Sequence, residues 1–438
     1  MLSSSDFKQR RKALMRRMKK QSVALLASAP AAIRNRDVEF PYRQHSDFHY
    51  LTGFNEPEAV AVLVPGRKQG QYVLFCREFD PEKALWTGQY AGLEGAREAF
   101  GADEAFPIGE LEKHLPELLE NRRCVYFPIG EEAGLDRQVM AAVRNIRGRA
   151  RTGVEAPYEF VALEHLLHEQ RLIKAPEEIR LMRKAAEVSV LAHQRVMRAC
   201  RPGRYEYEIE AELLHEFALH GCRAPAYPCI VAGGKNACVL HYTENAEPLR
   251  DGDLLLIDAG AEHASYAADI TRTFPVNGRF TEPQKILYEL VLDAQYAAIE
   301  EVRPGRGWMA PHEAAVKVLT KGLVKLGILE GKVSKLIQDE AYKQFYMHRT
   351  GHWLGMDVHD VGLYRTGGEW RPLEPGMVLT VEPGLYVAPD CTDVDPRWRG
   401  IGIRIEDDVL VTKDGSEILT AGLAKTCADI EALMAESA

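Results

Sequence analysis

The order of apolar and polar residues predicts interleaved helices and strands in the first part of the chain. A basic stretch at 8–20 has apolar residues at helical spacing, and a short apolar run at 23–30 follows it. Further short apolar runs at 60–65 and 72–76 have the length of buried strands, and 111–119 has a helical pattern. We therefore expect an α/β domain at the N-terminal end.

A long helix is predicted to begin at Pro176, and the domain boundary lies just before it. Proline fits the first turn of a helix, and Glu177 and Glu178 lie near the positive end of its dipole. Apolar residues then recur at steps of three and four. We expect an N-terminal domain at 1–172 and a second domain at 173–438.

The tetrapeptide Arg-Pro-Gly-Arg occurs twice, at 201–204 and 303–306. Each copy lies between two helix-like stretches, and strands containing His, Asp or Glu follow. The helix-like stretches are 176–200 and 205–220 in the first case, and 282–302 and 311–327 in the second. This matching context predicts an internal duplication of two helices plus half a sheet. The result is an α+β domain with pseudo-twofold symmetry and acidic residues where its two sheets meet.

Composition narrows the classes of protein that the chain can belong to. Its 438 residues, 46% hydrophobic and 27% charged, fit an ordinary globular protein of two or three domains. The net charge of −9 argues against binding nucleic acid or an anionic membrane over a broad surface. No apolar run approaches the roughly 20 residues of a membrane span.

The cysteines and the first 30 residues favour a cytoplasmic protein. Eight cysteines are scattered without a Cys-x-x-Cys pair, as expected for free thiols in a reducing compartment. The segment VALLASAP at 23–30 imitates an export signal, but its apolar core of about five residues is shorter than the roughly 7–15 that a signal needs.

Two aspartates in the segment DLLLIDAGAEHASYAADITRTFPV suggest a metal site. An apolar run, a break and then alternating residues predict a β-hairpin. If its turn centres at 263–264, Asp258 and Asp269 lie directly opposite each other, where like charges repel unless a cation separates them. The alternative is an asymmetric turn in which one aspartate caps a loop. The hairpin by itself leaves both open.

Further candidate ligands lie in three later segments. The segment MHRTGHWLGMDVHDVG has His348, His352 and His359 in a glycine-broken, non-helical stretch, and Glu382 ends an alternating strand. In IGIRIEDDVLV, isoleucines occupy one face of a strand while Arg404 and Glu406 occupy the other, which requires that both be paired. Carboxylates with one histidine favour Mn²⁺, or Co²⁺, Fe²⁺ or Zn²⁺, over a thiolate-preferring metal.

Neighbouring polar residues are expected to have ordinary roles. We expect Asp407 and Asp408 to end the strand in solvent, and His263 to be exposed at the hairpin tip. Glu374 belongs to a turn of the type Leu-Glu-Pro-Gly and is not a candidate ligand.

Taken together, these motifs resemble those of the Xaa-Pro aminopeptidases (aminopeptidase P), of the methionine aminopeptidase, prolidase and creatinase superfamily. The matching segments are HYTEN (241–245), IDAG…DITRTFPV, HRTGHWLGMDVHDVG, EPGMVLTVEPGLY and GIGIRIEDD, with YRQHSDFHYLTGFNEPEA (42–59) in the N-terminal half. The resemblance covers most of 176–430. It implies the "pita-bread" catalytic domain, itself pseudo-twofold, behind a creatinase/aminopeptidase-P-like N-terminal domain.

The resemblance also implies a set of metal ligands for two divalent ions per subunit, with Mn²⁺ favoured. Asp258 would bind one ion through both oxygens, while Asp269 and Glu406 would bridge the two ions. His352 and Glu382 would complete the shell of the second ion. Glu382 would also transfer a proton from the nucleophile to the leaving proline nitrogen.

Other residues gain implied roles outside the metal shell. His241 and His359 would hold the substrate and stabilise the tetrahedral intermediate, with His348 nearby in support. Arg404, Tyr386 and Asp37 would form an outer hydrogen-bonded set. Trp86 would reach the active site of a neighbouring subunit, which implies a homo-oligomer, a dimer or tetramer. Arg349 stands where the family pattern leads us to expect a smaller residue, so it bears on the substrate pocket.

The implied reaction is release of the N-terminal residue from peptides with proline second, by a hydroxide bridging the two metal ions. Prolidase, which uses the same metal set but cuts only dipeptides, is the alternative enzyme; HYTEN and the surroundings of Arg404 favour the aminopeptidase. A non-catalytic pita-bread peptide-binding protein is the alternative from another class. Such proteins, like creatinase, generally lack the metal ligands, whereas all five are present here. Methionine aminopeptidases do not need the large N-terminal domain.

Overall fold

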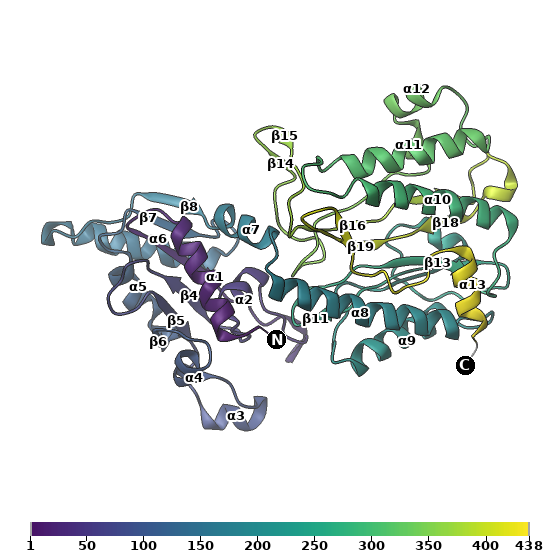
Figure 1. Cartoon of the computed structure of the whole chain (residues 1–438). Coiled ribbons are helices and arrows are strands. Elements are labelled where there is room, and N and C mark those ends of the chain that lie inside the picture. Colours follow the sequence, from purple (N-terminus) through teal and green to yellow (C-terminus); the bar gives the residue numbers. More distant parts are fainter. Residues whose placement is uncertain (1, 437–438) are drawn as a thin grey trace. The chain divides into compact units, whose positions relative to one another are not determined.

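The computed structural model describes residues 2–436, and the chain divides into two compact units (Figure 1). The first unit ends at Gln170 and the second begins at Arg171. Within residues 2–436, no helix combines the length and the apolar character needed to cross a membrane.

The first unit is built on a six-stranded mixed sheet in the order β6-β5-β4-β1-β7-β8. The central strand β1 pairs antiparallel with β4 and parallel with β7. Helices α5 and α6 cover an apolar face that includes Val62, Val73 and Val125. The predicted strands, the helix at 111–119 and the α/β class of this half are confirmed. The elements are α1 (Ser4–Arg17), β1 (Ser22–Ala27), β2 (Ile33–Asn35), β3 (Val38–Glu39), α2 (Ser46–Thr52), β4 (Val60–Leu63), β5 (Tyr72–Cys76), α3 (Pro81–Thr87), α4 (Gly92–Glu98), β6 (Glu104–Pro107), α5 (Leu111–Leu119), β7 (Cys124–Phe127), α6 (Ala133–Gly148), β8 (Glu159–Ala162) and α7 (Glu164–Leu172).

The second unit contains two helix pairs and two small antiparallel sheets. In Figure 1, α8 and α9 lie on one side of its strands, and α10 and α11 lie on the other. One sheet has the order β13-β10-β9 and the other β16-β19-β20, with β17 and β18 paired beside them. The elements are α8 (Pro176–Ala199), α9 (Glu206–Leu219), β9 (Ile230–Gly233), β10 (Leu254–Asp258), β11 (Glu262–His263), β12 (Tyr266–Ala267), β13 (Thr271–Pro275), α10 (Glu282–Glu300), α11 (Ala310–Lys325), α12 (Val333–Gln338), β14 (Arg365–Thr366), β15 (Glu369–Trp370), β16 (Val378–Val381), β17 (Gly384–Val387), β18 (Ile401–Arg404), β19 (Asp407–Val411), β20 (Ser416–Ile418) and α13 (Cys427–Ala435).

The two Arg-Pro-Gly-Arg turns make the same hydrogen bonds, which supports the predicted duplication. Gly203 N–H donates to the carbonyl of Leu249 (2.9 Å), and Leu249 N–H donates to the carbonyl of Arg204 (2.7 Å). In the second copy the same pair of bonds links 305–306 to Leu373, at 2.9 and 2.7 Å. The glycine of each turn has a positive φ (91° and 82°), which a glycine adopts without strain. Each leucine therefore fixes the start of a strand, β10 or β16.

The hairpin that contains Asp258 and Asp269 differs from the prediction in register. Its two-residue turn is at Ala264-Ser265, and both residues have the positive φ (49° and 66°) of tight hairpin turns. Asp258 consequently pairs with Thr271, and Asp269 lies diagonally to it. The prediction that the two aspartates are directly opposed is wrong, because the turn centre lies one residue further along than assumed. Gly260 permits a close approach of the strands here, since a Cβ would meet the carbonyl oxygen of Ala268.

A buried ion-pair cluster joins the first residues of the second unit to the loop at 347–362. Arg171 Nη2 donates to Asp360 Oδ1 (2.6 Å), and Lys174 Nζ donates to Asp360 Oδ2 (2.9 Å). Burial by itself raises the pKa of Asp360, but the charges of Lys174 and Arg171 outweigh it and hold the pKa below its usual value. The loop next to His359 is therefore held by buried ion pairs, and water can reach these charged groups only if the second unit unfolds locally.

Replacing Asp360 by Asn should lower the free energy of unfolding by about 3–5 kcal/mol at neutral pH, because two buried cations lose their partner. A group whose pKa is lowered on folding contributes stability above its unfolded pKa of about 3.9 and loses it as the pH falls through the folded pKa. The difference between wild type and D360N should therefore shrink below about pH 4. Denaturant unfolding at several pH values measures it. The control is D357N, whose carboxylate is 37% exposed; an equal loss in both variants would contradict the role of burial.

Candidate active site

A cleft of about 720 Å³ in the second unit brings most of the predicted site residues together. It lies where the ends of β10, β16 and β18 meet the glycine-broken loop at 347–362, which is non-helical as predicted. The predicted residues that line it are His241, Asp258, Asp269, His348, His352, His359, Glu382, Arg404 and Glu406, and Arg349 lines it as well. Tyr386 lies just behind this lining and contacts it through hydrogen bonds.

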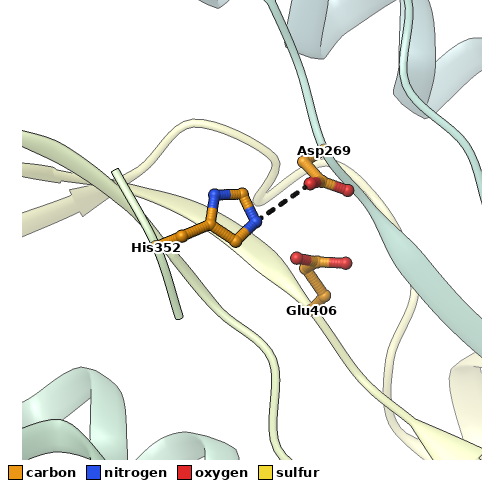
Figure 2. A group of neighbouring side chains, drawn as sticks. All are labelled: Asp269, His352 and Glu406. Atoms are coloured by element: carbon orange, nitrogen blue, oxygen red, sulfur yellow. Dashed lines mark ion pairs between the residues drawn. The ribbon is translucent and has the colours of Figure 1, made fainter. Parts of the chain in front are cut away.

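Asp269, His352 and Glu406 form the centre of the cluster and point toward one another (Figure 2). One ligand atom from each lies within 4.8 Å of the others. His352 Nε2 is 3.4 Å from Asp269 Oδ2 and 3.7 Å from Glu382 Oε1. The other ring nitrogen, Nδ1, donates to the carbonyl of Trp353 (3.0 Å), so Nε2 faces the carboxylates.

Tyr227 links the two hairpin aspartates that the strand register does not oppose directly. Its hydroxyl oxygen is 2.6 Å from Asp258 Oδ1 and 2.5 Å from Asp269 Oδ1. A phenol has a single proton to donate, so it can satisfy only one of these carboxylates at a time. The other oxygen needs a proton or a cation.

Arg404 connects the cluster to a chain of polar groups behind it. Its Nη2 donates to Asp258 Oδ2 (2.6 Å) and its Nη1 to the Tyr386 hydroxyl (3.0 Å). His348 Nδ1 donates to a backbone carbonyl (2.7 Å), so its Nε2 accepts the Tyr386 proton at 2.9 Å. Arg404 Nε also donates to Thr271 Oγ1 (3.1 Å), which in turn donates to Glu406 Oε2 (2.6 Å). One guanidinium therefore orients carboxylates from both sheets.

Backbone pairing holds Glu382 and His352 next to each other. Thr380 N–H donates to the carbonyl of His352 (3.0 Å), and Glu382 N–H donates to the carbonyl of Thr350 (2.8 Å). Thr350 is itself fixed by its side chain, whose Oγ1 is 2.8 Å from His312 Nδ1 and 2.5 Å from the Tyr346 hydroxyl. The loop is thus attached to the end of β16 and to α11.

The pKa values of these groups reflect crowding of negative charge. Burial and then the charge of Asp269 raise the pKa of Glu406 well above its usual range. Burial also raises the pKa of Glu382, to about 7, and that of Asp258. Burial lowers the pKa of His352, but Asp269 and Glu382 outweigh it and raise the pKa to about 9. For Asp269 itself, the hydrogen bonds from His352 and Tyr227 outweigh burial and lower the pKa.

This balance of charge fits a divalent cation. Four carboxylates meet in the cleft, whereas the positive groups in contact with them, among residues 2–436, are Arg404 and protonated His352. His348 stays neutral, because burial lowers its pKa to about 3. With all four carboxylates ionised, two further positive charges are needed to balance them, and oxygen-rich donor sets of this kind suit Mn²⁺ and related ions.

The rest of the cleft provides an apolar wall and two further histidines. Trp308, Trp370, Leu240, Val358 and Tyr364 line it, and Tyr364 stacks on Trp353. His359 lies with its ring centroid 4.4 Å from that of His352, and burial lowers its pKa. His241 lines the same cleft.

Three expectations for neighbouring residues are wrong. Asp407 and Asp408 are fully buried. Asp407 Oδ1 pairs with Arg272 (2.8 Å) and Oδ2 with Lys425 (2.8 Å), and these charges outweigh burial to lower its pKa to about 2. Asp408 Oδ2 accepts from the backbone N–H of Asp269 (3.2 Å). His263 is half-buried, with Nδ1 3.8 Å from Cys222 Sγ.

Tyr227 and Thr271 are site residues that the sequence interpretation missed. Thr271 falls two residues after Asp269, and strand alternation puts both on one face. That signal was available in the sequence. Tyr227 precedes β9 in a segment without a motif, and its position follows only from the pairing of β9 with β10.

Two predicted residues lie in the first unit, where each is exposed. Asp37 follows β2 in a short turn. Trp86 lies on α3 with 90% of its surface exposed, beside Leu85 at 86%.

Comparison with known proteins places both units. Residues 180–413 match metallopeptidase family M24, and residues 7–126 match the aminopeptidase P N-terminal domain. The chain is 48% identical to the Xaa-Pro aminopeptidase of Escherichia coli over 99% of its length and 98% of that protein. Two solved structures are similar, and both are covered over 98% or more of each chain. The aminopeptidase PepP of Pseudomonas aeruginosa has a TM-score of 0.98 at 60% identity, and a zinc-substituted E. coli aminopeptidase P with bound product has 0.96 at 47%.

These relatives confirm the predicted fold class, an aminopeptidase P N-terminal domain followed by a pita-bread catalytic domain. The match extends over nearly the whole chain, and the acidic cluster lies in the part that matches the peptidase family. The chain therefore belongs to the Xaa-Pro aminopeptidases of metallopeptidase family M24.

Proposed function

We propose that this chain releases the N-terminal residue from peptides with proline in the second position, using two divalent cations in its second domain, 173–438. The proposed ligands are Asp258, Asp269, His352, Glu382 and Glu406, and Mn²⁺ is the favoured metal. The observation that supports this is the convergence of four carboxylates and His352 in one cleft, with ligand atoms of Asp269, His352 and Glu406 within 4.8 Å of one another. When bound, two such ions lower the pKa of water and polarise a carbonyl oxygen.

Glu382 is the proposed proton carrier. It lies between His352 and His348, at 3.7 Å from each, and accepts from Thr380 Oγ1 at 3.4 Å. A group that must take a proton from the attacking water and give it to the leaving nitrogen works best with a pKa near the operating pH. In the metal-free protein, burial raises the pKa of Glu382 to about 7.

His241 and His359 are proposed to donate hydrogen bonds as negative charge develops on the substrate oxygen. Both line the cleft. The bond before proline has no N–H, so selection of proline depends on shape. The apolar wall of Leu240, Val358 and Trp370 provides a surface for the pyrrolidine ring.

The nature of the relatives supports the aminopeptidase over its alternatives. A structure of the E. coli enzyme is described in complex with product, and another in complex with substrate. Prolidase remains the competing activity for the same metal set, and only the peptide length separates the two.

The decisive test is cleavage of Ala-Pro-Ala and Ala-Pro after chelation and return of Mn²⁺. We expect tripeptide cleavage to vanish with chelator, to return with Mn²⁺, and to fall more than about 100-fold in D269N, since loss of a ligand exceeds the effect of outer-shell changes. The control is D339N, an exposed carboxylate on a distant helix. Cleavage of the dipeptide alone would establish prolidase instead, and no cleavage despite bound metal would refute peptidase activity.

Metal binding should release protons, because raised pKa values mean that Glu382 and Glu406 hold protons near neutral pH until a cation displaces them. Affinity for Mn²⁺ should therefore increase with pH through about 7. Calorimetric titration in buffers of different ionisation enthalpy measures the proton count, which should fall in E382Q. Heats that are identical in all buffers would contradict the proposed protonation.

We also propose that the protein is a cytoplasmic homo-oligomer in which Trp86 reaches the cleft of a neighbouring subunit. Two adjacent large apolar side chains, Leu85 and Trp86, are almost fully exposed on the seven-residue helix α3. Such a pair is costly in water and is typical of a contact site.

Light scattering should show a dimer or tetramer for the wild type, and W86A should lower kcat/KM without changing the melting temperature. The matched control is L219A, an apolar side chain that is 63% exposed at the end of α9. A wild-type protein that is monomeric and fully active would refute this arrangement.

A further inference from the structure

Arg349 is a cation at the cleft with no carboxylate to pair with. Its side chain is exposed and lines the same cleft as the metal-site carboxylates. Its Nη1 lies 3.1 Å from Met309 Sδ, and its guanidinium carbon is 5.9 Å from the centroid of the Trp370 ring. Among residues 2–436 no aspartate or glutamate forms an ion pair with it. A thioether sulfur is a weak acceptor, so most of the five guanidinium donors remain available.

The contacts of Arg349 orient its side chain but leave the guanidinium exposed to solvent. Met309 follows Trp308 directly before α11, and Trp370, on β15, lines the cleft. The Trp370 ring lies over the flat face of the guanidinium, and Met309 Sδ accepts from Nη1, so the N–H groups of Nη2 and Nε are left for a planar anion. The carbonyl of Arg349 accepts from His348 Nδ1, which fixes the backbone at this position.

Charge is therefore distributed unevenly along the cleft. Asp258, Asp269, Glu382 and Glu406 make part of the lining acidic, and Arg349 is a positive group in the same lining that forms no ion pair with them. Arg349 is three residues before His352, so their Cα atoms are at most about 11 Å apart. Three residues of extended peptide span about 10 Å. A tripeptide with its amino terminus at these carboxylates is therefore long enough for its carboxyl end to reach Arg349.

We propose that Arg349 binds the C-terminal carboxylate of short substrates, so that the enzyme selects Xaa-Pro-Xaa tripeptides with a free carboxyl end. The carboxylate accepts two hydrogen bonds from the guanidinium in the planar, bidentate arrangement that arginine favours. Longer or amidated peptides lose this contact while keeping the contacts around proline. This inference rests on the proposed function and adds a specificity that depends on peptide length.

The test compares kcat/KM for Ala-Pro-Ala and its C-terminal amide, with Mn²⁺-loaded enzyme. Wild type should prefer the free acid by about tenfold, the worth of one charge-assisted interaction. In R349Q the ratio should fall close to one, through slower cleavage of the acid and little change for the amide. R349K should give an intermediate ratio, because it keeps the charge but not the fork. The control is R365Q, a cation that also packs on Trp370, at 4.1 Å, but does not line the cleft.

Other results would overturn the proposal in distinguishable ways. A wild-type ratio of one refutes carboxylate binding while leaving the proposed function intact. An equal loss for both peptides in R349Q shows that Arg349 only positions the loop. If Ala-Pro-Glu amide, with a carboxylate on its side chain alone, is cleaved as well as Ala-Pro-Ala, the C-terminal assignment is wrong. No cleavage of either Ala-Pro-Ala peptide by wild type refutes the function itself.

Discussion

The second unit is organised around the repulsion among four carboxylates, those of Asp258, Asp269, Glu382 and Glu406. Like charges in a poorly hydrated cleft separate, take up protons or bind a cation. The structure prevents separation, because each carboxylate is fixed by a neighbour that is itself buried or paired: Arg404, Thr271, Thr380 or Tyr227. The fold therefore stores an unfavourable charge arrangement that protons or metal ions must relieve.

The duplicated turn explains how two sheets deliver ligands to one point. Asp258 and Glu382 each lie nine residues after the leucine that pairs with an Arg-Pro-Gly-Arg turn, Leu249 in one half and Leu373 in the other. They end β10 and β16 respectively, so the same construction is used twice. Of the other proposed ligands, Asp269 lies before β13, Glu406 lies between β18 and β19, and His352 comes from the loop at 347–362.

Much of this arrangement could be predicted from the sequence, because periodicity and turn chemistry are local. The helices at α5, α8 and α10 and the strands β4 and β5 follow from apolar spacing. The positions of the predicted ligands at strand ends also follow from it. The hairpin register could not be predicted. When the centre of the turn shifts by one residue, the apolar pattern hardly changes, but the residue opposite Asp258 changes from Asp269 to Thr271.

The burial of Asp407 and Asp408 could not be predicted from the local sequence pattern either. Asp407 and Asp408 follow a strand and look like its solvated end. Their partners come from Arg272, Lys425 and the backbone of Asp269, all more than ten residues away in the sequence. Tyr227 is a similar case. No motif surrounds it, and its place in the site follows only from the pairing of β9 with β10.

The repeated turn also has a consequence for how the chain tolerates insertions and deletions. The number of residues between the leucine bound to each turn and the following carboxylate cannot change. One added residue would place the carboxylate on the opposite face of the strand. The segment between β14 and β15, by contrast, is a short exposed hairpin whose length does not set the position of any ligand. Relatives of different length should therefore differ in such peripheral hairpins. The nine-residue spacing between leucine and carboxylate in each half should be the same in all of them, because it sets the position of the carboxylate.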